Sequence, residues 1–114
     1  FAIGGGAYLN NFLAVDSASA LTNGVMQHVA ITYDGAKAAA GVVMYVYATP
    51  IAMTTVKDVL VLTDVTNTVP VQIGARNGAN YPYGGLIGDV FVYNRVRTAL
   101  EIQHNYLVTK FRYV

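Results

Sequence analysis

The chain has no cysteine and little charge. Without cysteine, disulfides and thiolate metal sites are excluded. Charged residues make up 11% of the 114 residues, whereas a typical soluble domain has about 25%. The net charge is +1 and the seven Lys and Arg residues are scattered, so neither a nucleic-acid interface nor a polybasic membrane signal is indicated. We therefore expect much of the exterior to be buried against other subunits or within a larger protein.

The first residue is Phe1 rather than Met, and no basic region precedes an apolar stretch. We interpret the chain as processed or partial, without a signal peptide in view. Residues 38–56 form the longest uncharged stretch, close in length to a membrane-spanning helix. Gly41, Pro50 and the β-branched and aromatic run at 42–47 favour buried strand instead.

Turn signals of the β type divide the chain into short segments rich in Val, Ile, Thr and Tyr. One example is "QHVAITYDG", in which apolar residues alternate before Asp34-Gly35 ends the strand. This spacing predicts an all-β fold, an antiparallel β-sandwich. The predicted strands lie near 1–4, 7–15, 26–33, 41–48, 59–63, 69–74 and 84–93.

One short helix is predicted near the C-terminus, from Thr98 to about Tyr106. Thr98 can cap it, and Glu101 stands three residues later, as a capping box requires. Side chains four residues apart, such as Ile102 and Tyr106, would form a face that packs on the sheet edge.

Two stretches carry a family resemblance. "HVAITYDG", followed by "GVVMYVY", resembles the central strands of laminin-G-like domains in the concanavalin A-like lectin/glucanase superfamily. "IGARNGANYPYGGLIGDVFVYNRVRTALEIQHNY" resembles the closing segment of those domains, with matches at Ile73-Gly74, Gly85, Ile87, Asp89-Val90, Tyr93-Asn94-Arg95 and Glu101-Ile102. The resemblance covers about residues 25 to 106 and implies a concanavalin A-like jelly roll.

The chain departs from the family pattern at three places. Gln27 stands where the family usually has Trp, Tyr47-Ala48 replaces an Asn-Gly turn, and Gly88 replaces an acidic residue. The family's first strands have no counterpart before Phe1. We therefore expect residues 1–114 to be a single jelly-roll domain that lacks N-terminal strands of the full domain, and those strands to be cleaved, unseen or supplied by another chain.

Enzymatic activity is not predicted, although the superfamily contains glycosidases. Glycoside hydrolysis needs two carboxyl groups flanking one bond, and the Glu-x-Asp-x-x-Glu run of the family's glucanases is absent. The acids are isolated from one another: Asp16, Asp34, Asp58, Asp64, Asp89 and Glu101. Ser17 and Ser19 lie in a loop, and His28 and His104 are interpreted as structural rather than as parts of a triad.

No cofactor or metal is predicted, but Ca²⁺ is the one ion worth testing. Some relatives hold Ca²⁺ with loop carboxylates and backbone carbonyls, and such a cation needs several oxygen ligands. Turn formation explains the Asn and Asp residues more simply, and Gly88 weakens the metal hypothesis. The candidate ligands are Asp64, Asn67, Asn77, Asn80 and Asp89.

The favoured function is that of a structural or assembly module, which binds copies of itself or a protein scaffold. In "GVVMYVY" and "DVFVYNR" both strand faces are apolar or aromatic, so missing strands or a partner must cover the second face. The expected interaction residues are Tyr45, Tyr47, Phe91 and Tyr93. A virion shell or appendage and a cell-surface or other extracellular assembly would both suit this module.

The alternative is a lectin-like module that binds carbohydrate. The stretch "RNGANYPYGG" offers hydrogen-bonding groups and stacking rings on one loop. Its candidate ligand-binding residues are Arg76, Asn77, Asn80, Tyr81 and Tyr83. A structural explanation, in which Tyr81-Pro82-Tyr83 stiffens the loop, stays open at this point.

Overall fold

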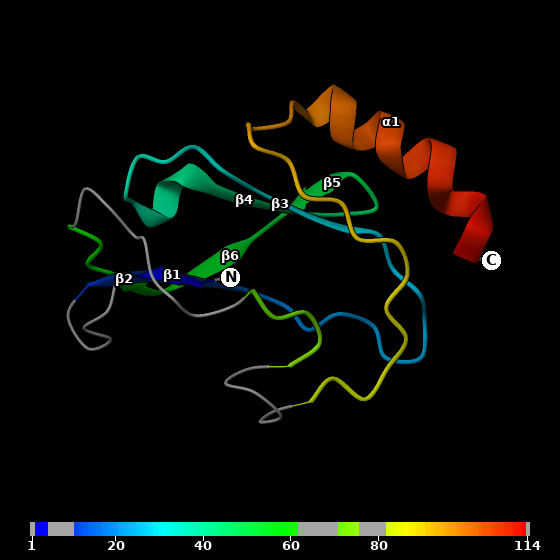
Figure 1. Cartoon of the computed structure of the whole chain (residues 1–114), viewed down its shortest axis with the longest axis horizontal. Helices are drawn as coiled ribbons and strands as arrows, with labels where there is room; N and C mark the ends of the chain where they lie inside the picture. The colour runs from blue at the N-terminus through cyan, green and yellow to red at the C-terminus, as the bar shows by residue number, and fades with distance from the viewer. Residues whose placement is uncertain (1, 5–10, 62–70, 76–81, 114) are drawn as a thin grey trace.

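The computed structural model describes residues 2–4, 11–61, 71–75 and 82–113. Among them are two antiparallel three-stranded sheets and one C-terminal α-helix (Figure 1). The first sheet has the order β1-β2-β6 and consists of Ala2–Gly4, Phe12–Ser17 and Met53–Asp58. The second has the order β3-β4-β5 and consists of Val29–Tyr33, Val42–Val46 and Thr49–Ile51.

The hydrophobic core lies between the two sheets. Leu13 and Val15 of β2 are almost fully buried and belong to one cluster with Val42 and Met44 of β4. These positions alternate along each strand, as expected for residues on one face of a sheet. Ala39, in the 3-10 turn η1 (Ala39–Gly41), and Leu60 complete the buried cluster, and Tyr33, Ile51 and Met53 pack against it.

The β4–β5 hairpin turns through two residues that are not glycine. Tyr47 and Ala48 have φ angles of 51° and 64° and connect the paired residues Val46 and Thr49. Positive φ at both central positions is the geometry of a type I′ turn, which normally uses Asn-Gly. The replacement of Asn-Gly noted in the sequence thus changes the residues of the turn but keeps its backbone shape.

The predicted C-terminal helix is confirmed. Helix α1 spans Ala99–Thr109 and is followed by the 3-10 turn η2 (Lys110–Tyr113). Both bonds of the capping box are present: the Glu101 backbone N–H donates to Thr98 Oγ1 at 3.2 Å, and the Thr98 N–H donates to Glu101 Oε2 at 2.9 Å. The helix ends three residues later than predicted because nothing in Leu107 to Thr109 interrupts it.

The strand predictions are correct for part of the chain. The strands predicted near 1–4, 26–33 and 41–48 correspond to β1, β3 and β4, and the one near 7–15 overlaps β2 in its described part. The uncharged stretch at 38–56 forms η1, strands and turns, and no helix among the described residues is long and apolar enough to cross a membrane.

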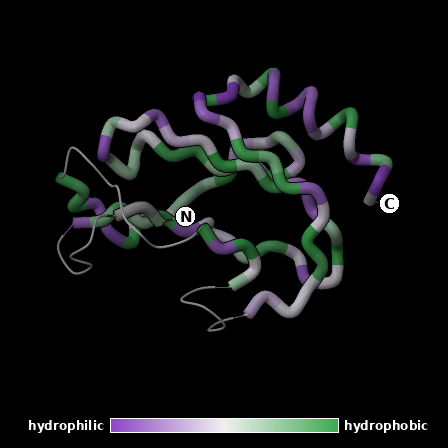
Figure 2. The backbone as a smooth tube through the Cα atoms, in the orientation of Figure 1, coloured by the Kyte–Doolittle hydropathy of each residue, from purple (hydrophilic) through white to green (hydrophobic). Residues whose placement is uncertain are grey.

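The other strand predictions are wrong where the structure describes them. Residues 59–61, 71–74 and 84–93 are not in strands, and β6 lies at 53–58 instead. Segment 84–93 has the apolar composition of a strand (Figure 2). A strand also requires a hydrogen-bonded neighbour, and this segment pairs with none of the described strands.

Candidate functional site

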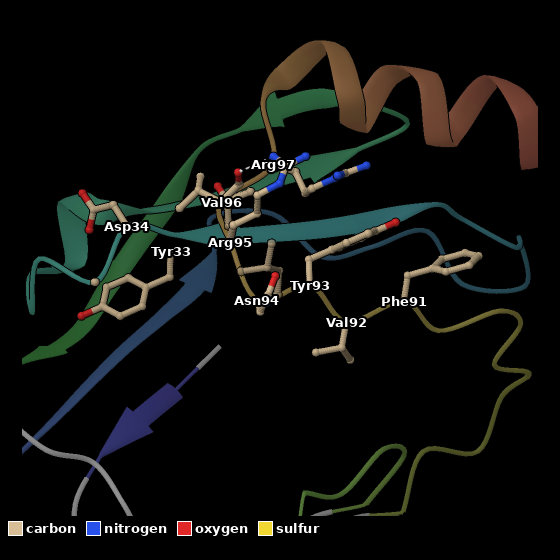
Figure 3. Close-up of a pocket in the computed structure, with 12 residues that line it drawn as sticks. Tyr33, Asp34, Phe91, Val92, Tyr93, Asn94, Arg95, Val96 and Arg97 are labelled. Carbon is tan, nitrogen blue, oxygen red and sulfur yellow. Dashed lines mark hydrogen bonds between the residues drawn. The ribbon is translucent and has the colours of Figure 1, made fainter.

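A groove runs beside β3 and is bounded on its other side by residues 86–97. It consists of two adjoining stretches of about 880 and 600 Å³. Both stretches are lined by Ile31 and Thr32 of β3 and by Phe91, Tyr93 and Arg97 of the opposite segment. Figure 3 shows the second stretch, in which residues 91–97 run across β3 toward α1. We call this feature the β3 groove.

The edge of β3 that does not face β4 carries backbone hydrogen-bonding groups that no described strand uses. The Tyr47 N–H donates to the His28 carbonyl at 2.9 Å, and the Asp34 N–H donates to the Gly41 carbonyl at 3.1 Å. Backbone groups alternate in an antiparallel pair, so the even-numbered residues bond to β4. Val29 and Ile31 therefore direct their N–H and C=O groups away from β4, and no described strand pairs with them there.

The side chains of Val29 and Ile31 are 44% and 43% exposed, although they lie on the core face of the sheet. Ile31 is paired with Met44, which is buried, and it shares its strand face with Tyr33, which packs against the core. The interior between the sheets is thus filled at the Tyr33 end of β3 and open at the Val29 end.

Apolar side chains also line the opposite side of the groove. Leu86 is 81% exposed and Phe91 is 57% exposed, and both line the larger stretch. Other exposed apolar residues of this stretch are Leu21, Ile87 and Val90. An apolar lining of this extent is typical of a contact surface rather than of a solvated one.

An ionic cluster holds the end of this segment to α1. Glu101 accepts from Arg95 Nη1 at 3.0 Å and lies 3.1 Å from Arg97 Nη1. The hydrogen bond from Arg95, together with the Thr98 cap, lowers the pKa of Glu101 to about 2. Arg97 also lies over the Tyr93 ring, 4.3 Å from its centre. The two arginines therefore engage one carboxylate and position residues 93–97.

Tyr93 makes a second contact with the helix, since its hydroxyl oxygen accepts a hydrogen bond from Asn105 Nδ2 at 2.9 Å. Asp89 forms a further ion pair with Arg112 of η2. The segment opposite β3 is thus attached to the C-terminal helical region rather than to the sheet.

Two buried nitrogens in the groove lining lack a hydrogen-bond partner among the described residues. They are His28 Nδ1 and Arg97 Nε. Burial lowers the pKa of His28 below 6.5, and its ring lies 5.5 Å from that of Tyr106. Polar atoms that are buried in a protein are normally satisfied.

The predicted interaction residues are only partly available at the surface. Phe91 and Tyr93 line the groove and are 57% and 43% exposed. Tyr47 is 39% exposed, and its ring lies 5.7 Å from Tyr106. Tyr45 lies on the sheet face opposite Met44 and is buried within the chain. It therefore does not belong to the exposed surface.

Of the predicted carbohydrate-binding residues, only Tyr83 lies in the described part of the chain. It is 61% exposed and lines the β3 groove, and its N–H donates to the Gly74 carbonyl at 2.8 Å. Arg76, Asn77, Asn80 and Tyr81 lie outside the described residues.

The sequence did not identify the groove residues Val29, Ile31, Leu86 and Arg97. The alternation of apolar residues in the sequence places Val29 and Ile31 on the core face of their strand. It does not reveal that the core is open beside Val29. Arg97 carried a weak signal, since it stands four residues before Glu101 and the two form an ion pair at that spacing.

Four of the described acids have structural roles. Asp34 Oδ1 accepts from the Ala36 N–H at 2.8 Å, and Asp58 Oδ1 accepts from the Ala39 N–H at 3.1 Å. Asp89 and Glu101 are paired with arginines. Within the described ranges, no three His, Asp or Glu side chains form a group that could hold a metal. Asp64, Asn67, Asn77 and Asn80 lie outside those ranges, so the question of Ca²⁺ stays with the sequence-based prediction.

Comparisons with known proteins extend this description. A family model described as the concanavalin A-like lectin/glucanases superfamily matches residues 1–103. The crystal structure of residues 221–444 of an S-layer domain-containing protein from Clostridium thermocellum is similar, with a TM-score of 0.56 and 22% sequence identity. The match covers 93% of this chain and 61% of that one, and at this identity it speaks for the fold alone. None of the curated proteins matches.

Proposed function

This chain belongs to the concanavalin A-like lectin/glucanases superfamily, and we propose that it is a non-catalytic assembly module with a jelly-roll fold. The single observation that supports this most strongly is the pair of exposed apolar surfaces on the two sides of the β3 groove. Val29 and Ile31 lie on one side, and Leu86 and Phe91 on the other. Soluble monomers rarely expose contiguous apolar surface of this kind without a partner.

The low charge of the chain supports the same function. With 11% charged residues, few ionic side chains are available to keep an isolated apolar surface in solution. Four of the described acidic side chains are engaged in the hydrogen bonds and ion pairs given above. This favours a module without hydrolytic activity, because a glycosidase needs two carboxyl groups placed around one bond.

An extracellular or cell-surface position fits this proposal. The similar crystal structure is of an S-layer domain-containing protein. A virion shell or appendage, the other setting expected from the sequence, stays a prediction.

Sedimentation velocity tests the assembly function. Residues 1–114 should associate in a concentration-dependent manner, and substitution of Leu86 and Val92 by Ser should weaken association, since these side chains are 81% and 86% exposed. The matched control is Leu100→Ser on α1, where Leu100 is 76% exposed and lies outside the groove lining. A monodisperse 12.2 kDa monomer with cooperative unfolding would contradict the proposal.

Carbohydrate binding is the second candidate function. The observation that favours it is the exposed ring of Tyr83 at the larger stretch of the groove, because aromatic faces are available for stacking on sugars. A glycan array should then show binding that is lost in Tyr83→Ala and kept in Leu100→Ser. No binding to any glycan by the wild-type chain would eliminate this candidate.

A further inference from the structure

We propose that the β3 groove accepts one extended strand of a partner protein, which pairs through its backbone with Val29 and Ile31 and packs against residues 86–93. This inference rests on the proposed assembly function and specifies the form of the partner. It assigns the contact to strand addition rather than to the docking of a folded surface.

The backbone of β3 provides the first argument. Val29 and Ile31 present N–H and C=O groups to the groove, and no described strand uses them. An open strand edge is a template for pairing with another chain, and an added strand satisfies these groups. Strand β3 has five residues, which corresponds to an edge of about 17 Å. A partner segment of comparable length is sufficient.

The shape of the groove provides the second argument. β3 forms one side, and the segment from Leu86 to Arg97 forms the other. A tail or loop in extended conformation can lie along β3 between these two sides. A folded second copy would also have to accommodate its own β4, which is bonded to its β3, and its own segment 86–97.

The charge of the lining indicates the chemistry of the strand. Three of the charged residues that line the groove have ion-pair partners: Asp89 pairs with Arg112, and Arg95 and Arg97 pair with Glu101. Asp34, in the lining of the smaller stretch, accepts from the Ala36 N–H. An anionic strand would therefore find both lining arginines already paired and would lose its hydration. The exposed side chains of Val29 and Ile31 instead favour apolar residues at alternate positions of an uncharged strand.

Residue-resolved hydrogen exchange, measured by NMR, tests the proposal. The probe is a capped nine-residue peptide of alternating valine and threonine, and its control has proline in place of the central threonine. With saturating probe, exchange at the Val29 and Ile31 amides should slow by at least about tenfold. The Ala30 and Thr32 amides, which already bond to β4, should change little, and the proline peptide should protect none of the four.

Two variants make the test specific. Val29→Pro removes an N–H that faces the groove without touching the bonds to β4, and it should abolish the protection of Ile31. If this variant does not fold, Ile31→Lys should weaken peptide binding at least about tenfold, because lysine on a strand edge opposes pairing. Leu100→Lys, on α1 outside the groove, should bind the probe like the wild-type chain.

Several results would overturn the proposal. Protection of Val29 and Ile31 without peptide at low protein concentration would mean that the edge is already paired within the chain. Protection that grows with protein concentration alone would assign the groove to a second copy. Absence of protection at any peptide concentration, or equal protection by the proline peptide, would reject strand addition. If association in sedimentation velocity persists while the peptide leaves the Val29 and Ile31 amides unprotected, strand addition fails and the assembly function stands, so the two failures are distinguishable.

Discussion

The ring of Tyr47 lies 5.7 Å from the ring of Tyr106, and this contact joins the β4–β5 turn to helix α1. Tyr47 has φ of 51°, a conformation that costs a non-glycine residue roughly 1 kcal/mol. Its hydroxyl donates to the Met26 carbonyl, with 3.4 Å between the oxygens. The turn thus accepts backbone strain at a position where the side chain contacts the helix.

Ala48→Gly should stabilise the chain by about 0.5–1 kcal/mol, because Ala48 has φ of 64° and glycine adopts that conformation without steric cost. Chemical denaturation measures the change. Ala52→Gly is the control, since Ala52 is not among the described residues with positive φ, and it should be neutral or destabilising. A loss of stability in Ala48→Gly as large as that in Ala52→Gly would contradict the strain argument.

Thr98→Ala should destabilise the chain by about 1 kcal/mol, because it removes the oxygen that accepts from the Glu101 N–H. The helix start would fray, and with it the attachment of residues 93–97 to α1. Circular dichroism during thermal unfolding measures this effect. Thr98→Ser keeps the oxygen and should retain most of the stability, so equal losses in the two variants would rule out the cap as the cause.

The helix and its cap could be predicted from the sequence because both depend on residues close together in the chain. The spacing from Thr98 to Glu101 determines the capping box, and alternation in β3 and β4 determines which side chains face the core. Met44 and Tyr45 are adjacent and both buried, so at Tyr45 the second face of β4 is covered within the chain itself and not, as expected, by missing strands or a partner.

The state of segment 84–93 could not be predicted, because strand formation depends on a neighbour rather than on composition alone. Its residues are of the β type, yet they pair with none of the described strands, and Tyr93 and Asp89 are attached to the helical region instead. The open edge at Val29 and Ile31 follows from the same missing pairing. Alternation of apolar residues shows which side chains face inward, but not whether other residues cover them.

The ionic cluster at Glu101 predicts a loss of stability in acid. Its pKa in the folded chain is lowered from 4.5 to about 2, mainly by the hydrogen bond from Arg95. Because the folded state holds the proton less tightly, this contribution is present above pH 4.5 and disappears as the pH falls toward 2. Denaturation midpoints between these values should decline less steeply in Glu101→Gln than in the wild-type chain. An identical slope in both would contradict the assignment to Glu101.

A second pH dependence arises at His28. The folded chain favours the charged form of Glu101 but the neutral form of His28. Burial lowers its pKa below 6.5 in the folded chain, so folding favours the neutral ring, and the unfolded chain binds the proton more readily. Stability attributable to His28 is therefore present above pH 6.5 and is lost as the pH falls through the lower folded value. Lys110, whose Nζ lies 6.0 Å from the centre of the Tyr106 ring, adds positive charge on the neighbouring helix.

We expect the NMR titration of the His28 ring to give a pKa below 6.5. His28→Gln should flatten the pH dependence of stability below pH 6.5, while Leu100→Ser, on the exposed side of α1, should leave it unchanged. If a strand occupies the β3 groove, it buries His28 further and should lower the pKa of the ring again, since desolvation disfavours the imidazolium. A rise of the His28 pKa on addition of the alternating peptide would show that the added backbone binds the charged ring instead.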